Sequence, residues 1–314
     1  MSLPTINDVQ AVEPVLTNLL IGYMQADDRF VASKVFPIVP TDKDSGTYYI
    51  FTKKYWFSDT MMPRAPGGDY SKSGFGVSST TYKTLQYALA KTIADEERAN
   101  SQIPMDLEQA AVMWLAQKNL LRKEIAFATD FMATSVWGTS DTTATDWDDF
   151  SLGDPYANIR TARRTISNNT GQRANTLVCG LIVADALENH PDIIDRLKYT
   201  AAATEVNIKS AIAAIFGLSS YLVAEASYNT ADEGQTFSAS AIIDDDALVC
   251  YVDPSAGIFG ATAGKTFSWL PGGGEGLVMN NRLDENDADL IKMKAQWDQK
   301  AVATDLGYFF SDIV

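Results

Sequence analysis

The chain has 314 residues, of which 46% are hydrophobic, and this is enough to bury one large core or two medium ones. Its 25 basic and 40 acidic side chains give a formal net charge of −15, which argues against a protein whose main task is to grip phosphate backbones. The two cysteines, Cys179 and Cys250, lie in apolar runs, so we expect reduced, buried thiols rather than a disulfide or a metal site.

The first 35 residues are predicted to form an arm that contains a short amphipathic helix, because apolar residues recur at helical spacing between Val12 and Tyr23. The opening MSLPTINDVQ lacks the features of a signal peptide, and no apolar run reaches the ~20 residues of a membrane span. We therefore expect a protein that folds in the cytoplasm. Its arm should pack on a distant part of the fold or on a neighbouring chain.

The next segment is predicted to be a long two-stranded excursion with an irregular tip. Pro37 and Pro40 impose extended backbone, and residues 47–57, TYYIFTKKYWF, form a predicted strand with aromatic side chains on both faces. Turn-forming residues follow at 64–76, and a second strand is expected at 80–93. Because both faces are apolar, the excursion needs cover from a core or from another subunit.

The charge is distributed unevenly along the chain. Residues 41–100 hold 8 basic and 7 acidic side chains, whereas residues 228–314 hold 5 basic and 14 acidic ones. If the excursion lies on the acidic surface of a neighbour, Lys53 and Lys54 are expected to help set its register.

Residues 104–136 form the clearest predicted helix. Pro104 suits the first helical position, and steps of four and three residues give an apolar stripe that only Lys118 interrupts. At 1.5 Å per residue the helix would be a rod of roughly 50 Å. The alanines in its stripe are weak coiled-coil residues, so a helix lying along a sheet fits better than a coiled coil.

The remainder of the chain alternates between predicted helices and strands. Strands are expected at 175–179, 220–225 and 247–252, and helices at 181–189 and 204–216. After the glycine-rich PGGGEG, the chain should return as strands around 290–297 and 301–310. This order predicts an α+β fold in which the chain leaves one domain, builds a second and comes back.

Few residues suggest chemistry. His190 precedes a proline and is expected to cap a helix end rather than to catalyse. The segment 260–266, GATAGKT, is one residue short of phosphate-loop spacing, and no helical pattern follows it. The acidic runs 244–246 and 284–289 lack the pattern of a calcium loop and are expected to be solvated. We therefore predict no catalytic, cofactor-binding or metal-binding residue, and no enzyme.

Several segments together resemble the major capsid proteins of tailed bacteriophages. They are GYMQADDRFVASKVFPIVPTDKDSGTYYIFTKKYWFSD, RAPGG, YALAKTIADEERANSQIPMDLEQAA and ENHPDIIDRLK, and the resemblance is densest at 22–132. It implies a Hong Kong 97-type fold. The implied parts are an N-terminal arm (1–35), an E-loop hairpin (36–100), a peripheral domain (101–170 and 276–314) with a spine helix (104–136), and an inserted axial domain (171–275).

The resemblance also implies a shell-forming role. The chain would assemble with itself into the hexamers and pentamers of an icosahedral head, enclosing double-stranded DNA without sequence-specific binding. A separate scaffolding protein, a portal and a decoration protein are the other implied partners. The implied location is the virion, after assembly in the host cytoplasm. Interface residues are expected on the E-loop: Tyr48, Tyr49, Phe51, Lys53, Lys54, Tyr55, Trp56 and Phe57.

Three alternatives remain at this point. An encapsulin-like shell uses the same architecture around enzymes, although residues 41–93 are long for its hairpin. A carboxylate-based α/β enzyme would need a cleft that the sequence cannot show. Another virion part, such as a tail-tube, portal or decoration protein, is less compatible with so long a predicted helix.

Overall fold

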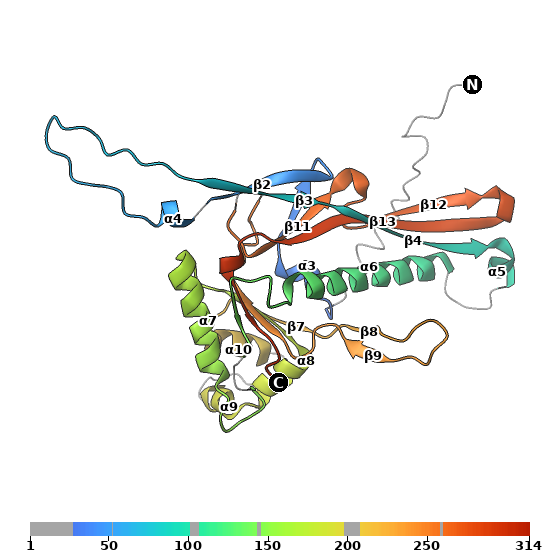
Figure 1. The fold of residues 1–314 in the computed structure, drawn as a ribbon. Coiled ribbons are helices and arrows are strands. Elements are labelled where there is room, and N and C mark those ends of the chain that lie inside the picture. Colours follow the sequence, from blue (N-terminus) through green and yellow to red (C-terminus); the bar gives the residue numbers. More distant parts are fainter. Residues whose placement is uncertain (1–27, 52, 101–106, 143–145, 198–207, 258–259) are drawn as a thin grey trace.

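The computed structural model describes residues 28–51, 53–100, 107–142, 146–197, 208–257 and 260–314, and the amphipathic helix predicted between Val12 and Tyr23 lies outside them. Helices and strands occur in runs along the chain rather than in strict alternation, as expected for an α+β fold. They form an elongated unit built on a long sheet and a compact α/β unit beneath it, from which two hairpins project (Figure 1). No helix in the described ranges is long and apolar enough to cross a membrane.

The elongated unit, which we call the long-sheet unit, is organised around one central strand. This strand, β13 (Ala288–Ala301), pairs along one edge with β4 (Leu85–Ala94). Along its other edge lie β12 (Leu277–Leu283) and then β11 (Gly264–Trp269), and β1 (Ile38–Thr41) extends the sheet in parallel with β11. The strand predicted around 290–297 is longer than expected, whereas the strand predicted around 301–310 is shorter, Gly307–Phe310, and lies in the other unit.

The long helix α6 (Leu107–Phe131) lies along this sheet (Figure 1). Its sequence contains neither glycine nor proline, so nothing interrupts 25 residues of helix. The prediction of helix to residue 136 is wrong. Residues 132–136 form turns, because the indole N–H of buried Trp137 donates to the Phe131 carbonyl at 2.6 Å and ends the helix there.

The buried face of α6 is rotated from the predicted stripe. Trp114, a member of that stripe, is 41% exposed, whereas Leu115 beside it is 1% exposed. Steps of four and three recur in both faces, so periodicity alone could not choose between them. The buried residues are Ala111, Val112, Leu115, Ala116, Asn119, Leu120, Lys123, Glu124, Ala126, Phe127 and Phe131.

The compact unit is a five-stranded mixed sheet with helices around it. The strand order is β5 (Thr139–Asp141), β14 (Gly307–Phe310), β10 (Ala247–Cys250), β6 (Thr176–Gly180) and β7 (Ser220–Ala224). Three of these strands are buried along their whole length, as their continuous apolar runs require. The helices are α7 (Pro155–Thr170), α8 (Leu181–Asn189), α9 (Pro191–Leu197) and α10 (Ile208–Phe216).

The boundary between the two units differs from the one drawn from the sequence. Helix α7 and strand β14, which were assigned to the peripheral domain, pack in the compact unit. Strand β11, assigned to the axial domain, belongs to the long sheet. The helix packs on strands, and the two strands pair with strands, that are distant in the sequence. Local sequence patterns carry no information about such partners.

Two hairpins project from these units (Figure 1). The first joins β2 (Ser45–Phe51) to β3 (Val77–Lys83) through the short helix α4 (Lys53–Trp56) and a long loop. The strand predicted at 47–57 therefore ends at Phe51, and the strand predicted at 80–93 is two strands divided at Thr84. The second hairpin pairs β8 (Ser227–Asn229) with β9 (Ala239–Ala241).

Two short helices and three 3₁₀ turns complete the described elements: α3 (Ala32–Val35), α5 (Asp95–Asn100), Leu270–Gly272, Asp284–Asn286 and Thr304–Leu306. The cysteines Cys179 and Cys250 are free and buried, which confirms the prediction of reduced core thiols. His190 is buried at the C-terminal end of α8, as predicted.

Candidate assembly surfaces

The base of the β2–β3 hairpin is anchored in its own chain. Tyr48 is 4% exposed and stacks on Phe267 of β11, with ring centroids 5.6 Å apart, and Tyr82 stacks on the same ring at 4.4 Å. Burial raises the pKa of the Tyr48 phenol. Tyr48, which the sequence placed among the interface residues, therefore belongs to the core that holds the hairpin.

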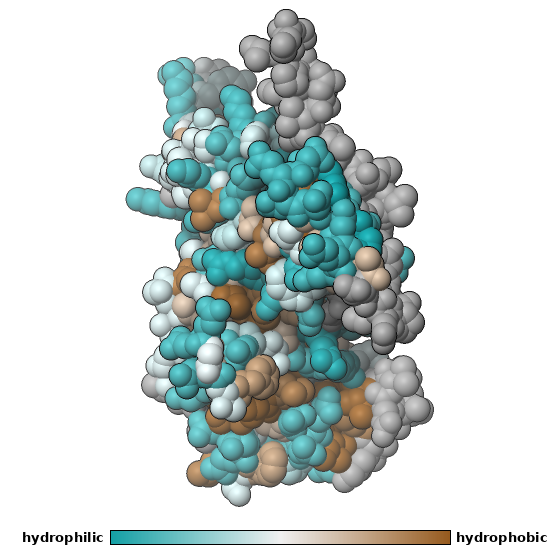
Figure 2. Space-filling model, turned by 90° about the vertical axis from the view of Figure 1, so that its right-hand side faces the viewer, coloured by the Kyte–Doolittle hydropathy of each residue, from teal (hydrophilic) through white to brown (hydrophobic). Residues whose placement is uncertain are grey.

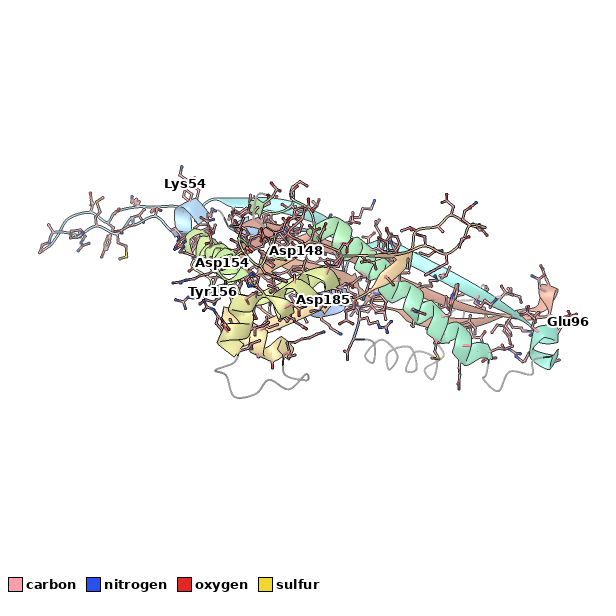
Figure 3. The ribbon with its side chains drawn as sticks, turned by 90° about the horizontal axis from the view of Figure 1, so that it is seen from below. Lys54, Glu96, Asp148, Asp154, Tyr156 and Asp185 are labelled. Atoms are coloured by element: carbon pink, nitrogen blue, oxygen red, sulfur yellow. The ribbon has the colours of Figure 1, made fainter. Side chains whose placement is uncertain are left out.

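One lysine of the hairpin also serves an internal contact. The Lys53 ammonium lies 2.6 Å from a carboxylate oxygen of Asp305 in the compact unit, and both side chains are partly exposed. Lys54, its neighbour on α4, is exposed and has no ion pair among the described residues. Figure 3 shows Lys54 near the start of the projecting loop, at the opposite end of the molecule from Glu96 on α5.

Beyond this anchored base, the hairpin presents a large apolar surface to solvent. Tyr49, Tyr55, Trp56 and Phe57 are 48–64% exposed, and Met61 is 91% exposed. The Trp56 and Phe75 rings lie 6.3 Å apart across the loop, so the two sides of the tip carry apolar groups that contact each other. Phe51 ends β2, opposite Val77. So much exposed apolar area in one projection is typical of a protein–protein contact.

A second apolar surface lies on the compact unit. In Figure 2, hydrophobic residues gather on the lower part of the molecule, where this unit lies, whereas the upper part is mostly hydrophilic. Leu181 and Ile182 at the start of α8 are 44% and 47% exposed, and Ile194 of α9 is 36% exposed. This surface was not predicted from the sequence, because the apolar pattern of α8 is that of an ordinary buried helix.

The far end of the long sheet is held by a network of charges. Arg282 in β12 contacts Asp95 at 2.5 Å, and Arg98 in α5 contacts Asp289 at 2.6 Å and Glu108 at 2.8 Å. Hydrogen bonds from these guanidinium groups lower the pKa of both Asp95 and Asp289. These ion pairs form an internal clamp between α5 and the β12–β13 turn.

A second polar cluster joins α6 to the glycine-rich turn at residues 271–276. Lys123, only 2% exposed, pairs with the Glu275 carboxylate, and the Asn119 amide donates to the Glu275 carbonyl at 3.0 Å. Burial lowers the pKa of Lys123 to about 7. Glycines are required here, since Gly273 has φ +113° and a Cβ at Gly272 would collide with Gln296.

The N-terminal arm is held to α6 by Glu124, the residue that follows Lys123. The Glu124 carboxylate accepts hydrogen bonds from the backbone N–H groups of Val31 and Ala32, at 3.0 and 2.9 Å. Glu124 is buried. Lys118 interrupts the predicted apolar stripe, whereas the buried charges of the helix are Lys123 and Glu124. Only their position on the buried face of α6 distinguishes these two residues, and that face is known only once the packing of the helix against the sheet is known.

The motifs examined for chemistry have structural roles. Residues 264–266 of the glycine-rich segment lie in β11, and buried Lys265 donates to the Gly257 carbonyl at 2.7 Å. His190 accepts a hydrogen bond from the Asp192 N–H and contacts the Gly153 carbonyl at 3.2 Å. Within the described part of the chain, no group of three or more His, Cys, Asp or Glu side chains is arranged to hold a metal ion.

Comparison with known proteins relates the chain to virus shells. No family model matches it. The major capsid protein of Burkholderia phage BcepMu is 25% identical over 319 residues, which cover 98% of each chain. A phage-related protein from Bordetella bronchiseptica RB50 has a TM-score of 0.72 at 19% identity and covers 97% of this chain and 98% of its own.

Two further solved structures share the fold at lower identity. The capsid protein of cyanophage P-SCSP1u has a TM-score of 0.60 at 10% identity, covering 90% of this chain and 87% of its own. A virus-like particle from Pyrococcus furiosus has a TM-score of 0.56 at 9% identity, covering 94% and 98%. These structures show the fold and confirm the expected Hong Kong 97-type architecture.

Proposed function

We propose that this chain, a member of the major capsid protein family of tailed bacteriophages, assembles with copies of itself into hexamers and pentamers that form an icosahedral head. One observation carries this function: the similarity to the major capsid protein of a Burkholderia phage runs from end to end of both chains. Two proteins that share only a motif or a domain would not be similar over their full lengths. The fold and the large exposed apolar surface of the hairpin are consistent with it.

In this proposal the β2–β3 hairpin is the E-loop and lies over a neighbouring subunit. The residues offered to that neighbour are Tyr49, Lys54, Tyr55, Trp56 and Phe57, since Tyr48 and Lys53 already have partners in their own chain. Each 100 Å² of apolar surface that the neighbour covers would contribute roughly 2.5 kcal/mol before association costs. Repeated around a shell, such contacts add up to a stable container.

The further partners follow from the same role. A scaffolding protein, a portal and a decoration protein are proposed as separate chains, with assembly in the host cytoplasm and the virion as the final location. The net charge of −15 suits a wall that encloses double-stranded DNA without holding it tightly. The compact unit is proposed to be the axial domain around which the capsomers form.

Electron microscopy of the protein expressed alone, together with size-exclusion chromatography at low and high salt, tests this function. Shells, tubes, capsomer rings or megadalton species are expected. A protein that stays monomeric even with its phage scaffolding protein would contradict the proposal.

The virus-like particle from Pyrococcus furiosus shares the fold, so the fold alone neither excludes the encapsulin-like alternative nor identifies the cargo. The full-length capsid relative favours a phage head. Nucleic-acid content of shells purified from infected cells separates the two: double-stranded DNA is expected here, and a protein cargo without DNA would favour the alternative.

A further inference from the structure

Helix α7 carries a pocket lined by arginine. Arg160, Arg163 and Arg164 recur at i, i+3 and i+4 and so share one face of the helix, and Arg173 joins them from beyond its C-terminal end. Ile159, Ala162 and Ile166 are buried on the opposite side, which fixes the rotation of the helix. The pocket has a volume of about 260 Å³, and Ser167 and Asn168 complete its lining.

Among the residues that the structure describes, these four positive charges have no negative partner. In the described part of the chain, no Asp or Glu oxygen lies within ion-pair distance of any of them. Arg163 is held in place by donating to the Phe216 carbonyl, and its Nε has no hydrogen-bond partner. Burial and the neighbouring Arg173 lower the pKa of Arg163. Guanidinium groups that repel one another at fixed positions favour a bound anion.

The β8–β9 hairpin supplies acidic groups that likewise have no ion-pair partner within the described ranges. Asp232 and Glu233 at its turn are exposed, and the described residues give neither of them an ion pair. The turn has a defined shape, because the Asn229 side chain accepts from the N–H groups of Ala231 and Ser238, and Gly234 adopts φ +85°. The two carboxylates are therefore presented on a structured projection rather than on a loose loop.

The two features face opposite ways. Figure 1 shows α7 on one side of the compact unit and the β8–β9 hairpin projecting from the other. The hairpin of one copy therefore cannot reach its own pocket, whereas two copies side by side in a row could bring the hairpin of one to the pocket of the other. Contacts between opposite sides of identical subunits are heterologous, and they close into rings when the rotation between copies permits.

We propose that Asp232 and Glu233 of one subunit bind in the arginine pocket, formed by Arg160, Arg163, Arg164 and Arg173, of the adjacent subunit. This inference rests on the proposed shell function and specifies one of its contacts. Arginine is suited to it, because its planar fork binds carboxylates in a bidentate manner. Subunits with a net charge of −15 repel one another, so a complementary pair at each contact would set the register of the ring.

Cysteine cross-linking tests the contact directly. The variant Arg164→Cys/Glu233→Cys should form disulfide-linked ladders of dimers and higher oligomers under mild oxidation, whereas each single variant should not. The native cysteines are fully buried and will not interfere. Arg164→Cys/Asp284→Cys is the matched control, since Asp284 is an exposed acid at the far end of the long sheet. Equal ladders in both double variants would overturn the inference.

Charge reversal gives an independent reading. Arg160→Glu/Arg164→Glu should lower the yield of rings or shells roughly tenfold, and adding Asp232→Arg/Glu233→Arg should restore most of it. If the arginine variant assembles normally, the inference is wrong. If it assembles normally but its shells retain less DNA, the pocket binds phosphate instead. Cross-linking is also measured on concentrated, unassembled protein, so the contact can be tested whether or not particles form. A wild-type chain that forms no particles would overturn the proposed function without deciding the contact.

Discussion

At the scale of single residues, the most informative groups are charges that the fold has buried. Asp246 lies beside β10, and its carboxylate accepts a hydrogen bond from the Asp312 N–H at 3.3 Å. Burial raises its pKa to about 6, and the nearby carboxylates of Asp245 and Asp312 act in the same direction. An aspartate with a raised pKa stabilises the fold when protonated, so its contribution is complete below pH ~4 and is lost as the pH rises through about 6.

We therefore expect Asp246→Asn to stabilise the unassembled protein at pH 7.5 by about 1 kcal/mol, after discounting for solvent screening. The asparagine oxygen can still accept from the Asp312 N–H. At pH 4 the variant and the wild type should be equally stable. Urea unfolding at the two pH values measures the difference, and a gain of the same size at pH 4 would show that the carboxylate charge is not its cause.

The Lys123–Glu275 pair gives a second prediction at this scale. Lys123→Met keeps most of the buried volume but leaves the Glu275 carboxylate without its cation, so we expect a loss of about 1–3 kcal/mol in unfolding free energy. Adding Glu275→Gln should recover most of the loss, because the remaining group is neutral. A double variant as unstable as the sum of the two single variants would mean that the pair is not coupled.

At the scale of elements, the β2–β3 hairpin combines an anchored base with a solvent-exposed tip. Trp56 and Phe57 are 63% and 64% exposed, so removing them should cost the isolated subunit little. In a shell they would be covered by a neighbour. We expect Trp56→Ala/Phe57→Ala to lower assembly yield at least tenfold, because aromatic anchors dominate contact energies.

The control for this prediction is Leu152→Ala, which removes a side chain that is 75% exposed outside the hairpin. Sedimentation of assembled particles, alongside thermal unfolding of the subunits, separates assembly from stability. If the hairpin variant and the control assemble equally well, the tip is not a subunit contact.

At the scale of the whole molecule, the chain crosses between its two units several times. Phe309 of β14 is 1% exposed in the compact unit, although it follows the long sheet's β13 closely in sequence. Phe309→Ala should destabilise by about 3–5 kcal/mol. The loss should appear first as faster hydrogen exchange in β6, β7 and β10.

Ile291→Ala is the matched control, because Ile291 is fully buried in the long sheet. It should accelerate exchange in β4 and β12 instead. Faster exchange in the same strands for both variants would show that the two units unfold as one.

The sequence by itself determined much of the molecule. Continuous apolar runs specified the buried strands β6 and β10, the absence of glycine and proline specified α6, and the clustered aromatics of residues 48–57 marked the hairpin. These features depend on neighbouring residues, whose periodicity and propensity are local properties. The family resemblance supplied the architecture that local patterns could not assemble.

Only the tertiary structure decided which partner each element has. It turned Tyr48 and Lys53 inward, rotated the buried face of α6 past Trp114, and placed β11 and β14 in different sheets. It also gathered the arginines of α7 with Arg173 into one pocket. Strand pairing and burial depend on residues that can lie hundreds of positions apart in the sequence. The apolar pattern of a segment therefore shows that its side chains need a partner, but not whether that partner lies in the same chain or in a neighbouring one.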